Sequence, residues 1–270
     1  MAKKKSALPM PKFHDQERSA ALLSVAVWLA PLVRTLFGLR IRGMEKLPKT
    51  GAYVLVSNHV TNVDALAVAY FVYAKLHRAP HFLAKEGLFR IPVIGKILLN
   101  AGQIPVYRSS GNRNDEPLKV AHEYLRRGHT IAIFPEGTLT REPNMWPMRG
   151  RSGAVRLALD TNVPVYPMAH WGSHEILPRY GSKFRPGFWK RVDVLVGDRI
   201  NLDEFYGKKL TPEQVGVATD RVMDAITGLV EELRGEKAPA QRWDPAAKGQ
   251  TATGNFVKAQ KAQQKSGDTK

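Results

Sequence analysis

The apolar positions of this chain form short runs that alternate with segments of helical period. Runs typical of buried strands occur at residues 39–44, 53–56, 81–84, 102–108, 130–134, 163–167 and 192–196. Helical patterns occur at residues 65–76, 91–100, 118–127, 153–160 and 211–234. This alternation predicts an α/β fold with a mixed central sheet flanked by helices. Two prolines in the run at 163–167 predict an edge strand or a bulge there.

The segment before these elements has a different pattern. Residues 19–33 carry no charge, and we expect residues 19–38 to form an apolar helix in a membrane interface, with Trp28 at the level of the lipid headgroups. The uncharged part would make a helix of about 22 Å, shorter than the ~30 Å hydrocarbon core, and Pro31 would kink it. A signal peptide is one alternative, although Arg34 interrupts the region where a cleavage site would follow. A helix packed in the core of the domain is another.

The two ends of the chain are polar and lack apolar periodicity. Residues 1–18 include a run of three lysines and predict a mobile basic arm. Residues 236–270 are rich in Ala, Gln, Lys and Gly and predict a disordered tail. One folded domain is therefore expected over residues 39–235.

The net charge of +17 indicates a polyanionic partner or surface. The two polar ends hold +3 and +4 of this charge, which leaves +10 on the residues between them. Anionic lipid, nucleic acid and a phosphorylated substrate are therefore all candidates. The chain has no cysteine, which excludes disulfides, thiolate catalysis and zinc sites built on cysteine.

One candidate for chemistry lies where the predicted strand at 53–56 meets the predicted helix at 65–76. His59 is followed five residues later by Asp64. An aspartate in the first turn of a helix can fold back onto a histidine just before it, hold one ring nitrogen and leave the other as a general base. The same spacing has a plainer interpretation, since Thr61 and Asp64 also form a helix-capping pattern. The spacing by itself does not choose between the two.

A second candidate follows the predicted strand at 130–134. Glu136, Gly137 and Thr138 place a carboxylate, a close backbone approach and a hydroxyl in one turn. Arginines near strand ends can bind a phosphate through two parallel hydrogen bonds. The arginines in question are Arg108, Arg141, Arg149 and Arg151. Taken singly, a plain turn and solvated surface charges explain these residues as well.

The motif around His59 is the first of four that resemble those of the glycerolipid acyltransferases. Asn58 and His59 with Asp64 match the Asn-His-x4-Asp motif of that family. Residues 102–108 resemble its second motif, a glycine followed six residues later by an arginine.

The other two motifs follow in the order typical of the family. Residues 134–138 match its Phe-Pro-Glu-Gly-Thr motif, and residues 163–167 look like its Val-Pro-x-x-Pro strand. The resemblance covers about residues 40–200. Four motifs in register are far more specific than one, so the resemblance favours a bacterial acyltransferase of this kind.

The resemblance implies a reaction and roles for named residues. His59 would take the proton of the free hydroxyl of a 1-acyl-glycerol 3-phosphate, with Asp64 orienting the imidazole. That hydroxyl would attack the thioester of acyl-CoA or of an acyl carrier protein, giving phosphatidate. The residues that would bind substrate are Asn58, Lys85, Arg108, Glu136, Gly137, Thr138, Arg141, Arg151 and Pro167. Of these, Arg108 and Glu136 would position the phosphorylated acceptor, and Pro167 would shape the acyl-donor side.

The resemblance also implies partners and a location. Residues 39–235 would be the acyltransferase catalytic domain, needing no metal and no cofactor beyond its acyl donor. It would work at the cytoplasmic face of the cell membrane as a peripheral or monotopic protein. Its partners would be a lysophospholipid, an acyl thioester, the anionic membrane surface and, for one class of donor, acyl carrier protein.

The chain departs from the family pattern at three positions, one of which is Arg151, where lysine is frequent. Leu139 stands where an arginine usually follows the Gly-Thr pair, so Arg141 or another arginine would supply that cation. Tyr107 stands before Arg108 where aspartate is common. These changes leave open another lysophospholipid or a glycolipid as the acceptor. A basic module that binds nucleic acid or anionic lipid is the alternative of a different class, although no nucleic-acid motif is recognisable.

Overall fold

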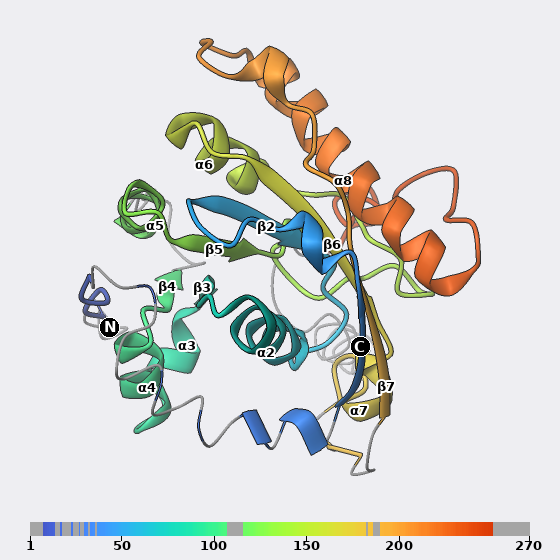
Figure 1. Cartoon of the computed structure of the whole chain (residues 1–270). Helices are drawn as coiled ribbons and strands as arrows, with labels where there is room; N and C mark the ends of the chain where they lie inside the picture. The colour runs from blue at the N-terminus through green and yellow to red at the C-terminus, as the bar shows by residue number, and fades with distance from the viewer. Residues whose placement is uncertain are drawn as a thin grey trace, which may run out of the picture.

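The computed structural model describes residues 8–13, 17, 23, 27, 30–31, 33–35, 37–106, 116–181, 183–185 and 190–250. In this part of the chain, helices cover both faces of a seven-stranded sheet (Figure 1). The strands are β1 (Phe37–Arg42), β2 (Tyr53–Ser57), β3 (His81–Lys85), β4 (Ile104–Val106), β5 (Thr130–Ile133), β6 (Val165–Trp171) and β7 (Lys190–Val196). The helices are α2 (Asp64–Leu76), α3 (Glu86–Phe89), α4 (Ile94–Asn100), α5 (Glu116–Arg126), α6 (Gly153–Thr161), α7 (Ser173–Ile176) and α8 (Pro212–Arg234), with short 3-10 helices η1 (Met44–Lys46) and η2 (Asp203–Phe205).

The strands are arranged in the order β1-β7-β6-β2-β5-β3-β4. β6 and β7 pair antiparallel, and every other neighbouring pair is parallel. The predicted mixed sheet flanked by helices is therefore confirmed. Because the five strands from β2 to β6 run the same way, their carboxyl ends lie at one edge of the sheet, where α/β proteins typically bind ligands.

β2 lies in the middle of the sheet and shows how the two core layers form. All of its residues are buried, and successive side chains point to opposite faces. Val54 and Val56 pack into the layer that contains α5, α6 and α8. Tyr53 and Leu55 pack into the layer that contains α2. The apolar run is continuous rather than alternating because a parallel strand inside a sheet is buried on both faces.

The last helix, α8, begins and ends where its sequence predicts. The Thr211 hydroxyl accepts a hydrogen bond from the Gln214 amide, and the Gln214 side chain accepts one from the Thr211 amide, a reciprocal capping box around Pro212. Gly235 ends the helix with a φ of 67°, the left-handed conformation that glycine adopts without strain. The helix predicted over residues 211–234 is confirmed.

One detail of the predicted elements is wrong. The run at 163–167, predicted as an edge strand or bulge, leads into β6, a central strand between β7 and β2. Pro167 is tolerated there because the ladder with β7 begins one residue later, at Met168. The short helix predicted at 91–100 is confirmed as α4, which begins after Val93, where φ is 68°.

The mobile basic arm predicted over residues 1–18 is bound to the domain wherever it is described. Phe13 lies edge-on to Tyr124, with ring centroids 5.2 Å apart. The Glu17 carboxylate pairs with Arg78 at 2.6 Å in a largely buried ion pair. The prediction of mobility is therefore wrong for the described residues of this segment, because an apolar and an acidic side chain that follow Lys12 find partners on the domain.

The disordered tail predicted from residue 236 also needs correction. Within residues 236–250, the Trp243 carbonyl accepts a hydrogen bond from the Arg149 amide at 2.9 Å, and Asp244 pairs with the Arg149 guanidinium at 2.6 Å. Arg242 pairs with two aspartates of α8. Low apolar content predicted disorder, but polar contacts hold this part of the tail against the domain. The prediction is wrong for these residues, and the rest of the tail lies outside the described residues.

The interface helix predicted over residues 19–38 falls mostly outside the described residues. Val33, which is described, packs into the same core layer as α2. Within the described ranges, no helix is both long enough and apolar enough to cross a bilayer. The placement of residues 19–38 in a membrane interface stays a prediction.

Candidate active site

The loop after β2 is fixed to β6 by a side-chain amide that makes the hydrogen bonds of a backbone peptide group. The Asn58 amide group donates to the His170 carbonyl, and its oxygen accepts from the His170 amide, both at 3.0 Å. These bonds extend the pairing of β2 with β6 beyond Ser57 and Met168. Asn58 is buried and committed to this contact. Asn58 therefore positions the loop, and its role in binding substrate stays a prediction.

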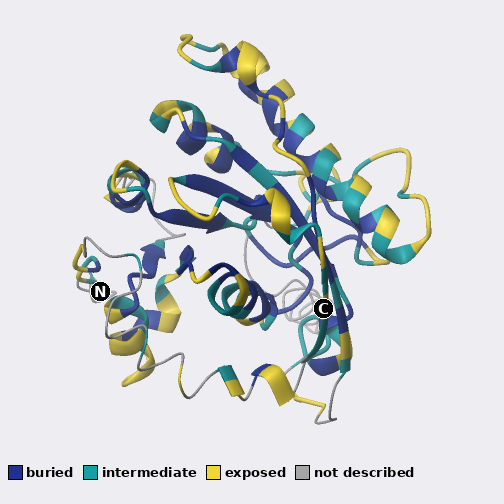
Figure 2. Cartoon of the chain, viewed as in Figure 1, coloured by how far each residue is buried: buried dark blue, intermediate teal, exposed yellow. Residues whose placement is uncertain are grey.

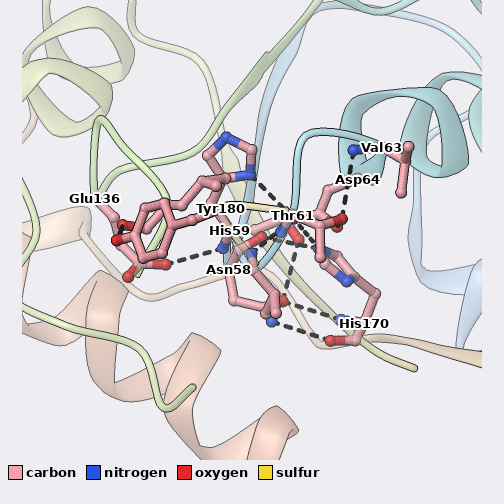
Figure 3. Close-up of polar contacts among 11 residues, drawn as sticks. Asn58, His59, Thr61, Val63, Asp64, Glu136, His170 and Tyr180 are labelled. Atoms are coloured by element: carbon pink, nitrogen blue, oxygen red, sulfur yellow. Dashed lines mark hydrogen bonds and ion pairs between the residues drawn. The ribbon is translucent and has the colours of Figure 1, made fainter. Parts of the chain in front are cut away.

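His59 lies on this loop (Figure 3). Its imidazole is stacked on the Phe134 ring, with the centroids 4.1 Å apart. Its Nδ1 lies 3.0 Å from Oδ2 of Asp64. An ionised carboxylate only accepts hydrogen bonds, so Nδ1 carries the proton. The side chain is 18% exposed, and its Nε2 makes no hydrogen bond to a described residue. The neutral ring therefore holds a lone pair at Nε2 that can accept a proton.

Asp64 opens α2 and is fully buried. Its Oδ2 also accepts from the amides of Val60 at 2.6 Å and Thr61 at 2.8 Å, and its Oδ1 accepts from the Thr61 hydroxyl at 2.8 Å. Burial would raise the pKa of this carboxyl, but the charges of His170 and His59 and the donors of the loop outweigh it and hold the pKa below its ordinary value. Asp64 thus stays ionised, closes the loop before α2 and orients His59.

A second histidine stands behind Asp64, on β6. The Nε2 of His170 lies 2.9 Å from the Asn58 carbonyl and 3.6 Å from Oδ2 of Asp64, and since both neighbours accept hydrogen bonds, Nε2 carries the proton. Its Nδ1 is buried and makes no hydrogen bond to a described residue. A second proton there would leave a buried N–H group unsatisfied, which favours the neutral ring. His170 lies 112 residues from Asn58 in the sequence, so no local pattern predicted it.

Glu136 follows β5 and is also buried. Its Oε1 accepts from the His59 amide at 2.9 Å, and its Oε2 accepts from the Met148 amide at 3.1 Å. Burial raises the pKa of Glu136 to about 8, against the opposing effect of these two amides. Both oxygens are engaged by backbone groups, so Glu136 ties the histidine loop to the segment before α6. Its contact with the phosphorylated acceptor stays a prediction beside this positioning role.

The turn after Glu136 is bound to the same loop. The Thr140 amide donates to the His59 carbonyl at 2.7 Å. His59 therefore has its amide, its carbonyl and its ring all held, by Glu136, Thr140 and Asp64 in turn. Thr140 was not among the predicted site residues, because its contact uses the backbone and leaves no signal in its side chain.

Leu139 stands where the family has an arginine, and the next arginine in the sequence, Arg141, is not exposed. Leu139 is buried, and Arg141 is only 3% exposed. Tyr180 lies near this arginine: burial raises the pKa of its phenol, and the charges of Arg179 and Arg141 oppose the rise. Arg141 is thus enclosed by protein and is the less accessible of the two arginines predicted to bind substrate at this turn.

Arg151 is the exposed arginine at the turn. Gly137 has a φ of 69°, and a Cβ at that position would lie 2.8 Å from Nε of Arg151, so the guanidinium stem rests directly on the glycine. The Arg151 amide donates to the Pro135 carbonyl at 2.8 Å. The predicted pair Gly137 and Arg151 is therefore brought together, and glycine is needed both for its conformation and for this close approach.

The remaining predicted residues lie in other places. Lys85 is exposed at the end of β3, two positions from β2 in the sheet. Thr138 is buried within the turn. Pro167 is buried in β6, and a Cβ on Gly197 would lie 2.8 Å from its Cγ, so it packs within the sheet, and its role on the acyl-donor side stays a prediction. Arg108 lies outside the described residues.

An apolar cavity of about 340 Å³ adjoins the site. Asn62 and Ala65, which flank Asp64 closely in the sequence, form part of its lining, and α3 and α4 contribute Leu88 and Ile97. A volume of a few hundred Å³ with apolar walls is typical of sites for small molecules. The cavity suits an acyl chain or another apolar tail.

The arrangement supports acid–base chemistry at Nε2 of His59. A base held by a buried carboxylate can take a proton from a hydroxyl, and the carboxylate then stabilises the imidazolium that forms. In the described ranges, no three His, Asp or Glu side chains are grouped so that they could hold a metal ion.

Comparisons with known proteins give matches to sequence families and to single proteins. Residues 38–171 match the model of the acyltransferase family. A 1-acyl-sn-glycerol-3-phosphate acyltransferase of Brassica napus is 30% identical over 153 residues, 56% of this chain and 42% of that protein. One of Borreliella burgdorferi is 27% identical over 193 residues, 71% of this chain and 72% of that protein. The chain spans about two fifths of the length of the plant relatives it matches, 42% and 41% in two of them.

A solved structure matches as well. The crystal structure of the 1-acyl-sn-glycerophosphate acyltransferase of Thermotoga maritima gives a TM-score of 0.62 at 23% identity, over 81% of this chain and 82% of that one. At this level of identity the likeness shows a shared fold.

Proposed function

The chain belongs to the acyltransferase family through residues 38–171, and on this premise we propose that it transfers an acyl group from a thioester to the free hydroxyl of 1-acyl-glycerol 3-phosphate, giving phosphatidate. The observation that carries the proposal is the imidazole of His59, whose Nδ1 is held at 3.0 Å by a buried carboxylate. The names of two similar proteins, each a 1-acyl-sn-glycerol-3-phosphate acyltransferase, support the acceptor.

The reaction needs one base and no protein nucleophile. Nε2 of His59 takes the proton of the acceptor hydroxyl as its oxygen attacks the thioester carbonyl carbon. The carbon–sulfur bond then breaks, and the proton passes from the imidazolium to the departing thiolate, so the enzyme returns to its starting state. General-base assistance of this kind contributes about 10²–10⁴-fold to a rate.

The polar headgroup of the acceptor would lie near the carboxyl ends of the parallel strands. Arg151 is exposed at this turn and rests on Gly137, and a guanidinium there suits the paired hydrogen bonds of a phosphate. Lys85, exposed at the end of β3, is a further cation, and Arg108, from the family's second motif, is proposed as another from its place in the sequence. We propose Arg151 as the substitute for the arginine absent at Leu139.

The apolar part of a substrate would occupy the cavity beside Asn62 and Ala65. Acyl-CoA and acyl-carrier protein remain the two classes of donor, and no cofactor beyond the donor is proposed. The net charge of +17 favours work at an anionic surface, which we propose to be the cytoplasmic face of the cell membrane.

A panel of acceptors tests the proposal directly. The purified chain is given acyl-CoA and, separately, lysophosphatidate, glycerol 3-phosphate or lysophosphatidylcholine, and thioester cleavage is followed. We expect lysophosphatidate to give the highest kcat/KM. Faster turnover of lysophosphatidylcholine would assign the chain to another lysophospholipid, and cleavage with none of the three would contradict the proposed reaction.

A further inference from the structure

Exposed apolar side chains gather on one short segment of the domain. The described residues contain eleven large hydrophobic side chains that are exposed, and five of them lie between residues 88 and 97. We call these five, Leu88, Ile91, Val93, Ile94 and Ile97, the α3–α4 surface. Figure 2 shows exposed segments over both helices at the side of the molecule away from α8. Single exposed apolar residues are ordinary, but a cluster of this kind marks an interaction site.

Among the residues that the structure describes, nothing covers the outer side of the α3–α4 surface, and it is not a loosely packed core. α4 is apolar on most sides, with the sequence Ile-Gly-Lys-Ile-Leu-Leu-Asn, yet Gly95 is its only fully buried residue. A Cβ on Gly95 would lie 2.0 Å from the Phe89 carbonyl oxygen, so the two helices are in backbone contact. Phe89 is buried and anchors α3 to the domain. The turn is therefore rigid while its outer side faces solvent.

The tip of the turn carries the most exposed of these side chains. Val93 is 67% exposed and has a φ of 68°, a conformation that a β-branched residue rarely adopts. The backbone around it is held by hydrogen bonds from Ile94 to Pro92 and from Gly95 to Ile91, both at 2.8 Å. Val93 is thus held in a strained backbone conformation with its apolar side chain exposed.

The charges around the α3–α4 surface are basic. The sequence from residue 87 to residue 114 contains no acidic residue and has four basic ones. Lys85 and Lys96 are exposed on either side of the apolar side chains. Glu86 is the one acidic residue of α3, and it lies 3.6 Å from Arg90. Apolar side chains together with basic residues are complementary to a medium that is apolar inside and carries negative charges at its surface.

From this composition we propose that the α3–α4 surface is the docking site of the domain on an anionic lipid bilayer. Val93 and Ile94 enter the boundary between headgroups and acyl chains, while Lys85 and Lys96 lie among the phosphates. Amphipathic elements with apolar residues on one side and basic residues beside them bind membranes in this manner. A second copy of the chain would instead meet a surface of the same positive charge, which disfavours self-association.

The position of the surface connects it to the site. Leu88 and Ile97 belong to the α3–α4 surface and also line the apolar cavity that reaches Asn62 and Ala65 beside Asp64. A lipid could therefore pass from the bilayer toward His59 along apolar side chains. This last step rests on the proposed function, whereas docking itself does not.

The lack of cysteine makes a direct test possible. Val93→Cys gives the chain its first thiol, which can be labelled with an environment-sensitive dye. The matched control is Val217→Cys on α8, which is 54% exposed. On mixing the full-length chain with vesicles of phosphatidylcholine and phosphatidylglycerol, we expect the dye at residue 93 to shift to the blue and brighten several-fold, while the dye at residue 217 stays unchanged. Equal responses at both positions, or none at residue 93, would overturn the proposal.

A second measurement uses unlabelled chains and no substrate. Val93→Glu with Ile94→Glu should lower the vesicle partition coefficient about tenfold or more, because two carboxylates would have to approach anionic headgroups. Val217→Glu should leave the partition coefficient unchanged. Lys96→Gln should lower it about fivefold on anionic vesicles and leave it unchanged on pure phosphatidylcholine.

The same variants distinguish the remaining outcomes. A wild-type chain that is dimeric without lipid, together with a monomeric Val93→Glu, Ile94→Glu variant, would show that the surface joins two copies, and the proposal would be wrong. Vesicle binding that is unaffected in a folded double variant would also overturn it. Because these assays contain no acyl donor or acceptor, their failure would leave the proposed acyl transfer untouched.

Discussion

Two buried carboxyl groups hold His59, and they behave in opposite ways. Asp64, at the start of α2, contacts the imidazole, and its pKa lies below the ordinary value. Glu136, after β5, contacts the backbone amide of the same histidine, and its pKa is raised to about 8. Both are buried in the same part of the domain. Burial alone therefore does not decide the protonation of either group.

The difference comes from the partners of each carboxyl. Burial raises the pKa in both cases, but Asp64 faces the rings of His170 and His59 and accepts bonds from a closed loop. Glu136 accepts two backbone amides, which are weaker compensation, and the charge of Asp64 opposes its ionisation. The Asp64 carboxylate therefore places a negative charge beside the His59 imidazole, whereas Glu136 holds the backbone of His59 in place by a hydrogen bond.

Removing the charge at Asp64 should have the largest effect. In Asp64→Asn the neutral amide no longer fixes the proton on Nδ1 of His59, so the lone pair at Nε2 is lost in much of the population. We expect kcat to fall about 10³–10⁴-fold with acyl-CoA and lysophosphatidate. Asp198→Asn, at a side chain that is 84% exposed, is the control and should keep wild-type turnover. A loss below about tenfold in a folded Asp64→Asn chain would contradict the role given to this charge.

Removing the ionisable group at Glu136 should have a smaller effect. A glutamine keeps one acceptor but turns an NH₂ group toward the amide of His59 or of Met148, where two donors then face each other. We expect kcat to fall about 10–100-fold and stability to fall by about 1–3 kcal/mol. Glu142→Gln is the control, since Glu142 is buried in the same region and bonds the Trp146 amide through one oxygen only. Equal losses of kcat in Glu136→Gln and Glu142→Gln would show that the hydrogen bond from Glu136 to the His59 amide has no particular effect on the reaction.

His170 should contribute less again, and in a way that depends on its N–H group. Leucine removes the donor to the Asn58 carbonyl, and we expect kcat to fall about tenfold, whereas glutamine can replace that donor and should cost about threefold or less. Equal losses of kcat in folded His170→Leu and His170→Gln chains would reduce His170 to a packing role.

The smallest effects are expected in the pH dependence of stability, and they have opposite signs. Glu136 binds a proton in the folded chain up to about pH 8 but loses it near 4.5 when unfolded, so its contribution to stability falls as pH rises between these values. The slope is at most about 1.4 kcal/mol per pH unit. Asp64, with its lowered pKa, contributes stability that is present above its ordinary value of 3.8 and is lost as pH falls below it.

Denaturant unfolding across pH measures both contributions. The difference in unfolding free energy between wild type and Glu136→Gln should decrease from pH 5 to pH 8, whereas the difference between wild type and Asp64→Asn should decrease only in the acid range. Parallel curves for wild type and Glu136→Gln would show that Glu136 ionises normally, and the contrast with Asp64 would disappear.

The sequence predicted the contact between His59 and Asp64 because five residues separate them and a strand end followed by a helix brings them together. The sequence predicted a mixed sheet but not the order of its strands. The predicted strand positions were enough to place the four motif regions near strand ends. His170 was not predicted, because its contact depends on the lateral pairing of β2 with β6, which no local pattern encodes. Thr140 was missed since it acts through its backbone.

Other features were missed because the sequence does not show which partners a polar group will find. Glu136 was singled out from its motif, but the hydrogen bonds that its two oxygens accept from backbone amides were not predicted. The tail at residues 236–250 was predicted to be disordered from its composition, but ion pairs such as that between Arg149 and Asp244 bind it to the domain. Composition indicates how much apolar area a segment can bury, but it does not indicate which charged residues of the domain the segment will pair with.

The central claim is that His59 is the base, and one measurement tests it most directly. His59→Ala is compared with His122→Ala, because His122 is also a partly exposed histidine beside an aspartate, with its Nε2 3.7 Å from Asp160. CoA release from acyl-CoA with lysophosphatidate is followed in both, and unfolding midpoints confirm that both are folded. Release should drop about 10²–10⁴-fold or to background in His59→Ala and stay near wild type in His122→Ala. Near wild-type release by a folded His59→Ala chain would contradict the account.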